Sequence, residues 1–221
     1  MNSDYIVNKI IPDKNITSIA DLPLTEADPA LSDKEKIDRI TYLFREIMHV
    51  LGLDLEDDSL SGTPRRVAKM YVNELFSGLD PKNAPSISLF DNKYGYQRML
   101  VEKDITLYSQ CEHHFVPIIG KVHVAYIPGK KVIGLSKINR IVQYFAHRPQ
   151  VQERLTMQIA QALKDILHHE DVAVLIEADH LCVAARGIKD TNSKTATSAY
   201  SGQFENDSCK QEFLSYIYGK N

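Results

Sequence analysis

Two short segments of the sequence gather thiol and imidazole side chains. Cys111, His113 and His114 lie within four consecutive positions, and His180 and Cys182 form a second group far downstream. The C-x2-H spacing of Cys111 and His114 lets one turn direct a sulfur and a nitrogen at the same ion, and Cys182 can supply a third ligand. These donors suit Zn(II). Because three protein ligands leave the fourth position to water, we predict a hydrolytic zinc site.

The remaining histidines of these segments predict acid–base chemistry. His113 and His180 would lie beside the metal without being ligands, and an imidazole with a pKa of about 6.5 suits proton transfer at neutral pH. Zinc lowers the pKa of its bound water to about 7, so the parts of a hydrolase are present. We expect the other histidines to be ordinary surface or core residues: His49, His123, His147, His168 and His169.

Cations occupy positions that a helix dipole disfavours. Arg65 and Arg66 fall in the first turn of one predicted helix, and Lys137 and Arg140 near the start of another. Solvated surface side chains are one explanation, and a bound anion that reverses the local electrostatics is the other. Together with Arg186, these cations would hold a polyphosphate, although the sequence contains no P-loop motif.

Glu153 lies in the first turn of a further predicted helix. An acid there is favoured by the dipole alone, which is the simpler explanation. The alternative is that its carboxylate accepts the hydrogen bonds of a guanine's N1–H and 2-amino group, a pattern that adenine cannot match.

Apolar spacing and capping signals place the helices. Ser32 and Glu35 predict a capping box for a helix that ends before Gly52, and Thr63 is the expected N-cap of a helix that begins with Pro64. Three further helices are predicted: residues 137–145 capped by Ser136, residues 150–168 opened by Pro149, and residues 210–218.

Alternating and β-branched residues predict the strands. If the strand that begins at residue 172 continues to residue 182, His180 and Cys182 face the same side of it. Helices followed by antiparallel strands that enclose two helices predict an α+β fold. A loop over 80–97 separates the strands from the first helices. The first strand segment is expected to bend at 102–104. The predicted strand segments are residues 99–107, 115–119, 122–127, 132–135, 172–178 and 195–204.

Composition and charge exclude several classes of protein. The 221 residues are 43% hydrophobic with a formal charge of −3, which gives no electrostatic reason to expect nucleic acid or an anionic membrane as a partner. No apolar stretch approaches the roughly 18–20 residues of a membrane span. Three cysteines, two of them beside histidines, argue against a disulfide framework, so we expect a cytoplasmic protein with Cys209 as a free thiol.

The sequence resembles the GTP cyclohydrolase I family, the zinc enzymes of pterin and folate biosynthesis. The resemblance runs from about residue 33 to the C-terminus, whereas the polar, proline-containing residues 1–31 match nothing diagnostic and are predicted to form an irregular arm. The motifs that carry it are TPRRVAKM at 63–70, CEHHF at 111–115, GLSKINR at 134–140, RPQVQERL at 148–155 and HLCVAARG at 180–187.

The resemblance implies the conversion of GTP and water to 7,8-dihydroneopterin triphosphate and formate. Cys111, His114 and Cys182 would be the zinc ligands. His113 would protonate the purine imidazole ring while activated water attacks C8, and His180 would act as a second acid or base in ring opening and rearrangement.

Further site residues follow from the same resemblance. Ser136 would assist ribose opening, and Gln152 and Glu153 would hold guanine. Arg65 occupies a position where relatives often have His, so of these two arginines only Arg66 is expected to contact the triphosphate. The implied triphosphate contacts are Arg66, Lys137, Arg140 and Arg186.

The implied fold is a T-fold, an antiparallel four-stranded sheet with two helices on one face. It would occupy residues 97–221, after a helical region at 32–96. The resemblance also implies a homodecamer whose active sites lie between subunits.

Two other readings remain open. A nitrile reductase of the T-fold group would use Cys111 or Cys182 as a nucleophile and would need NADPH, although the adjacent histidines argue against it. A zinc-stabilised scaffold that only binds nucleotide would need a fourth permanent ligand, for which His113, His180 and Cys209 are the candidates.

Overall fold

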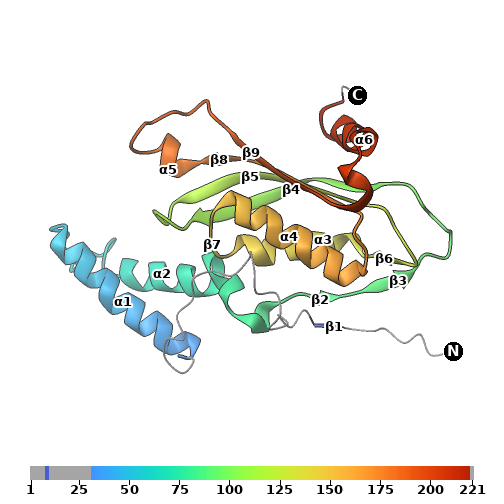
Figure 1. Ribbon diagram of the computed structural model, residues 1–221. Helices are drawn as coiled ribbons and strands as arrows, with labels where there is room; N and C mark the ends of the chain where they lie inside the picture. Colours follow the sequence, from blue (N-terminus) through green and yellow to red (C-terminus); the bar gives the residue numbers. More distant parts are fainter. Residues whose placement is uncertain (1–7, 10–30, 220–221) are drawn as a thin grey trace.

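The computed structural model describes residues 8–9 and 31–219 (Figure 1). Most of the predicted arm therefore lies outside the described residues. Its strand β1 (Asn8–Lys9) is placed antiparallel to β2 (Ser86–Ile87). A second small ladder joins β3 (Leu89–Asp91) to β6 (Lys131–Ile133). The segment 80–97, predicted as a loop, thus carries two short strands.

The central sheet positions the candidate site. Its four long strands are antiparallel neighbours in the order β4 (Leu100–Cys111), β5 (Pro117–Tyr126), β8 (Val172–His180) and β9 (Thr195–Tyr200). A fifth, two-residue strand, β7 (Pro149–Gln150), pairs in parallel with the end of β4. The α+β prediction is confirmed, and the sheet has one strand more than predicted.

The strand β5 is continuous where the sequence predicted two runs. Gly120 lies at the expected break, and a Cβ at this position would be 2.1 Å from the carbonyl oxygen of Glu177 on β8, so glycine permits the close approach of the two strands. The predicted bend in β4 is confirmed. The pairing shifts between Glu102 and Ile105, and Asp104 has a φ of 60°.

Two helices cover one face of the sheet, as Figure 1 shows: α3 (Leu135–Ala146) and α4 (Gln152–Leu167). Their apolar stripes meet the sheet in the main core, where Leu107, Ile138 and Ile159 are completely buried. This packing fixes the start of α4 directly beside the end of β4.

Both helix starts differ from the prediction. Gly134 and Val151 are the N-cap residues, so Ser136 lies inside the first turn of α3 and does not cap it. Pro149 belongs to β7, because the backbone of the next residue, Gln150, is paired with Cys111. Because of this long-range strand pairing, α4 begins two residues later than predicted.

The N-terminal helices are α1 (Asp33–Val50) and α2 (Thr63–Met70), which continues as a π-helical turn. The capping box of Ser32 and Glu35 is confirmed, since each side chain bonds the backbone of the other. Thr63 is not the N-cap. It is the first helical residue, and its hydroxyl accepts a hydrogen bond from Arg66 Nη2 at 2.8 Å.

The opposite face of the sheet carries the C-terminal helix α6 (Asp207–Tyr218) over a second apolar cluster that includes Phe204 and Phe213. Cys209 is a free thiol packed against this cluster, as predicted. None of the helices in the described residues is long and apolar enough to cross a membrane.

Candidate metal centre and active site

A tight turn between β4 and β5 presents the first candidate ligands. Cys111 ends β4, and its carbonyl oxygen accepts a hydrogen bond from Phe115 N at 2.8 Å. Glu112 N donates to the carbonyl oxygen of Gln150 at 3.0 Å, which ties the turn to β7. Phe115 closes the turn with a φ of 52°. The C-x2-H spacing thus lies on one rigid reversal of the chain.

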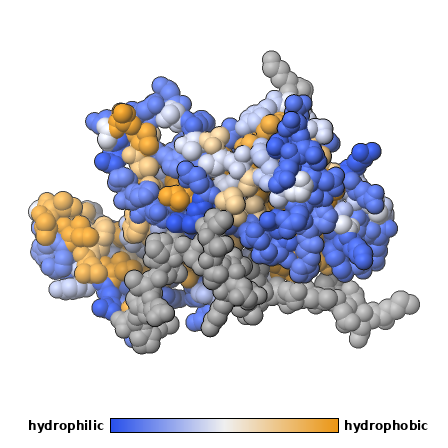
Figure 2. Space-filling model, viewed as in Figure 1, coloured by the Kyte–Doolittle hydropathy of each residue, from blue (hydrophilic) through white to orange (hydrophobic). Residues whose placement is uncertain are grey.

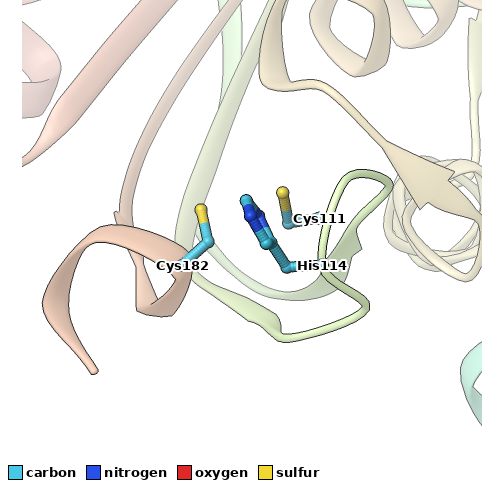
Figure 3. Close-up of side chains that lie close together, drawn as sticks. All are labelled: Cys111, His114 and Cys182. Atoms are coloured by element: carbon cyan, nitrogen blue, oxygen red, sulfur yellow. The ribbon is translucent and has the colours of Figure 1, made fainter. Parts of the chain in front are cut away.

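The third candidate ligand comes from another element. Cys182 lies on α5 (Leu181–Ala184), a single helical turn that follows β8, so the prediction that the strand continues to this residue was wrong. The ligand atoms of Cys111, His114 and Cys182 nevertheless all lie within 4.8 Å of one another. Figure 3 shows the three side chains pointing into a common space, Cys182 from α5 and the other two from the turn.

The chemistry of this cluster fits a metal cation. Burial, and then the neighbouring Cys111 sulfur, raises the pKa of the Cys182 thiol, because two thiolates side by side repel each other. A divalent cation between them removes that penalty, since it binds the thiolate form. Two sulfurs and one imidazole nitrogen form the donor set that zinc prefers when one position stays open.

His113 lies on the same turn, with its ring exposed. Its Nδ1 atom is 3.7 Å from Cys111 Sγ, and its Nε2 atom is 3.8 Å from a carboxylate oxygen of Glu112. The ring is therefore beside the candidate ligands and open to a substrate.

His180 ends β8, two residues before the candidate ligand Cys182. Its Nε2 atom is 2.8 Å from Gln152 Oε1. Burial lowers the pKa of His180, and the carboxylates of Glu153 and Asp179 oppose that shift. Glu153 itself is exposed in the first turn of α4. The start of α4 and the end of β8 thus bring His180, Gln152 and Glu153 together.

One of the predicted phosphate-binding cations lies at the cluster. Arg186 Nη1 is 2.8 Å from His114 Nε2. Because a guanidinium only donates, a metal bound at this nitrogen would release the Arg186 side chain. Arg186 is exposed, so it remains accessible to an anion. A phosphate bound there would be adjacent to the candidate metal.

The other predicted substrate residues lie elsewhere in the subunit. Lys137 Nζ is 3.4 Å from Ser86 Oγ, and Arg140 lines a cavity of about 360 Å³ on the outer side of α3. Ser136 shares their helix. Arg66 donates to the carbonyl oxygen of Ser59 at 2.9 Å, in the N-terminal helical region.

The length of the sheet separates Ser136 and Lys137, at the start of α3, from the cluster. The start of α3 lies at the Tyr126 end of β5, since Ile133 N donates to the Tyr126 hydroxyl. The Cys111 turn lies at the other end, next to Pro117. A strand of 10 residues spans about 33 Å. One subunit alone therefore does not bring both groups to one substrate.

Sequence reasoning missed an ion pair that holds the turn. Arg154 Nη2 donates to a carboxylate oxygen of Glu112 and, at 2.9 Å, to the carbonyl oxygen of Pro149, while its Nε donates to Gln150 Oε1 at 3.1 Å. Arg154 is a cation in the first turn of a helix, so the criterion that singled out Arg65 and Arg66 also applies to it.

Sequence comparisons with known proteins agree on one family. Residues 40–218 match the family described as GTP cyclohydrolase I. A protein of Flavobacterium johnsoniae named GTP cyclohydrolase 1 is 55% identical over 216 residues, which cover 98% of this chain and 96% of the relative. Proteins of the same name from Yersinia pseudotuberculosis and Shewanella putrefaciens are 57% and 53% identical, over 84% and 83% of this chain and 85% and 86% of the relatives.

Proposed function

Because the chain belongs to the GTP cyclohydrolase I family, we propose that it converts GTP and water to 7,8-dihydroneopterin triphosphate and formate, the first step of pterin and folate biosynthesis, at a zinc centre held by Cys111, His114 and Cys182. The observation that carries the proposal is the convergence of these three ligand atoms within 4.8 Å. His113 and His180 lie on the two segments that supply the ligands.

The zinc ion, when bound, supplies a Lewis acid that activates water for attack on the purine. His113 would hold the proton that passes to the imidazole ring of the substrate, because its ring is exposed on the ligand turn. His180 would move a second proton, from the end of β8. The burial of His180 supports a neutral ring that is ready to accept one.

Substrate recognition would use the start of α4 and the cations. Glu153 is exposed beside His180, so its carboxylate is free to accept the N1–H and 2-amino hydrogens of guanine. Arg186 would bind the triphosphate next to the metal, with Arg66, Lys137 and Arg140 as further contacts and Ser136 assisting ribose opening. Gln152, also predicted to hold guanine, is buried at the start of the same helix.

A complete site would then require several subunits, and we propose a homodecamer of T-fold subunits. The separation of α3 from the ligand turn along β5 supports active sites between chains. An apolar face of α1 supports an assembly, and Figure 2 shows hydrophobic residues gathered over this helix. The large hydrophobic side chains exposed on α1 and its C-cap are 52–88% exposed: Tyr42, Leu43, Ile47, Val50 and Leu51.

A cytoplasmic location is part of the proposal. All three cysteines are free thiols, which fits a reducing compartment, and a zinc thiolate site persists there.

An assay of the purified protein tests the function. With GTP as substrate, we expect the absorbance and fluorescence of a pterin to appear together with one formate per GTP consumed, and metal analysis to give one zinc per subunit. Removal of the metal with a chelator should abolish both signals, and added zinc should restore them. A zinc-replete protein that releases no formate from GTP would refute the proposal.

A further inference from the structure

Both polar atoms of the Gln152 side chain form hydrogen bonds within the subunit. It is 1% exposed at the start of α4. Its Nε2 atom lies 3.1 Å from the carbonyl oxygen of Ile176 on β8 and 3.0 Å from that of Thr195 on β9, and it also lies 3.1 Å from Thr197 Oγ1. The amide therefore bridges the helix to both strands, and no polar atom of it faces an open site.

These partners fix the orientation of the amide. Carbonyl oxygens only accept hydrogen bonds, so the atom that faces Ile176 and Thr195 is the NH2 group. The oxygen then faces His180, and the hydrogen in the 2.8 Å contact belongs to His180 Nε2. As a result, the other ring nitrogen, Nδ1, is the one left to exchange a proton with a substrate.

Thr197 and Thr156 strengthen this arrangement. Thr156 Oγ1 donates to the carbonyl oxygen of Gln152 at 2.8 Å, and the hydroxyls of Thr156 and Thr197 lie 2.7 Å apart. The backbone and the side chain of Gln152 are thus tied to the same strand. A buried, satisfied network of this kind holds its members in one geometry.

We propose that Gln152 is a positioning residue for His180, and that the side chain which recognises guanine in this turn is that of Glu153 alone. The inference rests on the proposed function. It predicts that a change at Gln152 slows the chemical step, because His180 loses its orientation, while recognition of the base is preserved.

Kinetics with GTP and ITP separate the two roles, because ITP lacks the 2-amino group. For Gln152→Met we expect kcat with GTP to fall about 10–100-fold, with KM and the preference for GTP over ITP within about twofold of wild type. Glu153→Gln is the matched comparison and should lose that preference. A Gln152→Met variant that loses the preference for GTP while kcat is kept would overturn the proposal.

Thr197 provides a milder variant in case Gln152→Met does not fold. Thr197→Val removes one acceptor of the amide and suits a strand, so we expect kcat to fall severalfold with KM unchanged, whereas Thr197→Ser keeps the hydroxyl and should restore kcat. Equal kcat values for Thr197→Val and Thr197→Ser would contradict the proposal.

A crystal structure of the folded Gln152 or Thr197 variant gives a readout that does not need turnover. We expect the His180 ring to be rotated or spread over several positions in Gln152→Met or Thr197→Val, and unchanged in Glu153→Gln. An unchanged ring in the first variants would refute the positioning role. Absence of GTP turnover in the wild-type enzyme would instead refute the proposed function, so the two failures are distinct.

Discussion

Arg154 of α4 forms an ion pair with Glu112, the residue between Cys111 and His113. The side chains are only 13% and 26% exposed. The pair therefore joins the first turn of α4 to the ligand turn in a place with little solvent screening, unlike the exposed pair of Arg65 and Asp38.

Loss of the Arg154 guanidinium should loosen the ligand turn. For Arg154→Met we expect the free energy of unfolding to fall by about 2 kcal/mol, because Glu112 loses a charged hydrogen bond. Zinc affinity, measured by competition with a chelator, should fall about 10–100-fold. Arg65→Met is the control and should cost less than about 1 kcal/mol without affecting zinc. Equal zinc affinity in the two variants would show that the pair does not hold the turn.

Cys182→Ser should lose the metal, because a serine hydroxyl is a poor substitute for a thiolate ligand. We expect zinc per subunit to drop far below one and formate release to vanish. Cys209→Ser serves as the matched control, since Cys209 packs in the other apolar cluster. If metal analysis finds full zinc occupancy in Cys182→Ser, the ligand assignment is wrong.

His113→Ser should separate metal binding from proton transfer. The His113 ring is beside the ligands but outside the group of three converging donor atoms, so zinc content should stay near one per subunit. Formate release from GTP should fall by at least about 100-fold, as expected for loss of a general acid. Turnover close to that of the wild type would exclude His113 from this role.

Acid should destabilise the fold through a buried histidine on β5. Burial lowers the pKa of His123, although Asp104 and Glu177 oppose the shift. Within the described part of the chain, its Nε2 atom is buried without a hydrogen-bond partner, 4.0 Å from Glu177 Oε2, while its Nδ1 accepts from Asp104 N at 3.2 Å.

Proton linkage gives the direction in which the free energy of unfolding changes with pH. The unfolded chain takes up a proton near its pKa of about 6.5, before the folded protein does, so the free energy of unfolding should decrease as the pH falls below about 6.5. Urea unfolding at several pH values should show a weaker pH dependence for His123→Gln than for the wild type. Burial also lowers the pKa values of His147 and His180, so part of the dependence should remain. An identical slope in the variant would contradict this account.

Much of the local structure was predictable because its causes are local. The capping box of Ser32 and Glu35 involves residues three apart on one helix end, and the bend in β4 follows from a short run of charges. The grouping of Cys111 and His114 is likewise a matter of one turn. The sequence alone therefore determined the α+β class, the approximate extent of the long helices and the two ligand-bearing segments.

Pairing between distant segments decided the rest, because its energy depends on partners that a local pattern does not contain. Pairing of β7 with β4 places Pro149 in a strand and not at the start of the predicted helix. Cys182 lies on a helical turn where a strand was expected. The length of β5 separated Lys137 from the ligand turn, and the approach of β8 and β9 buried Gln152 against His180. Residue types and spacing showed which chemistry was available, whereas tertiary packing determined which side chains remain free to perform it.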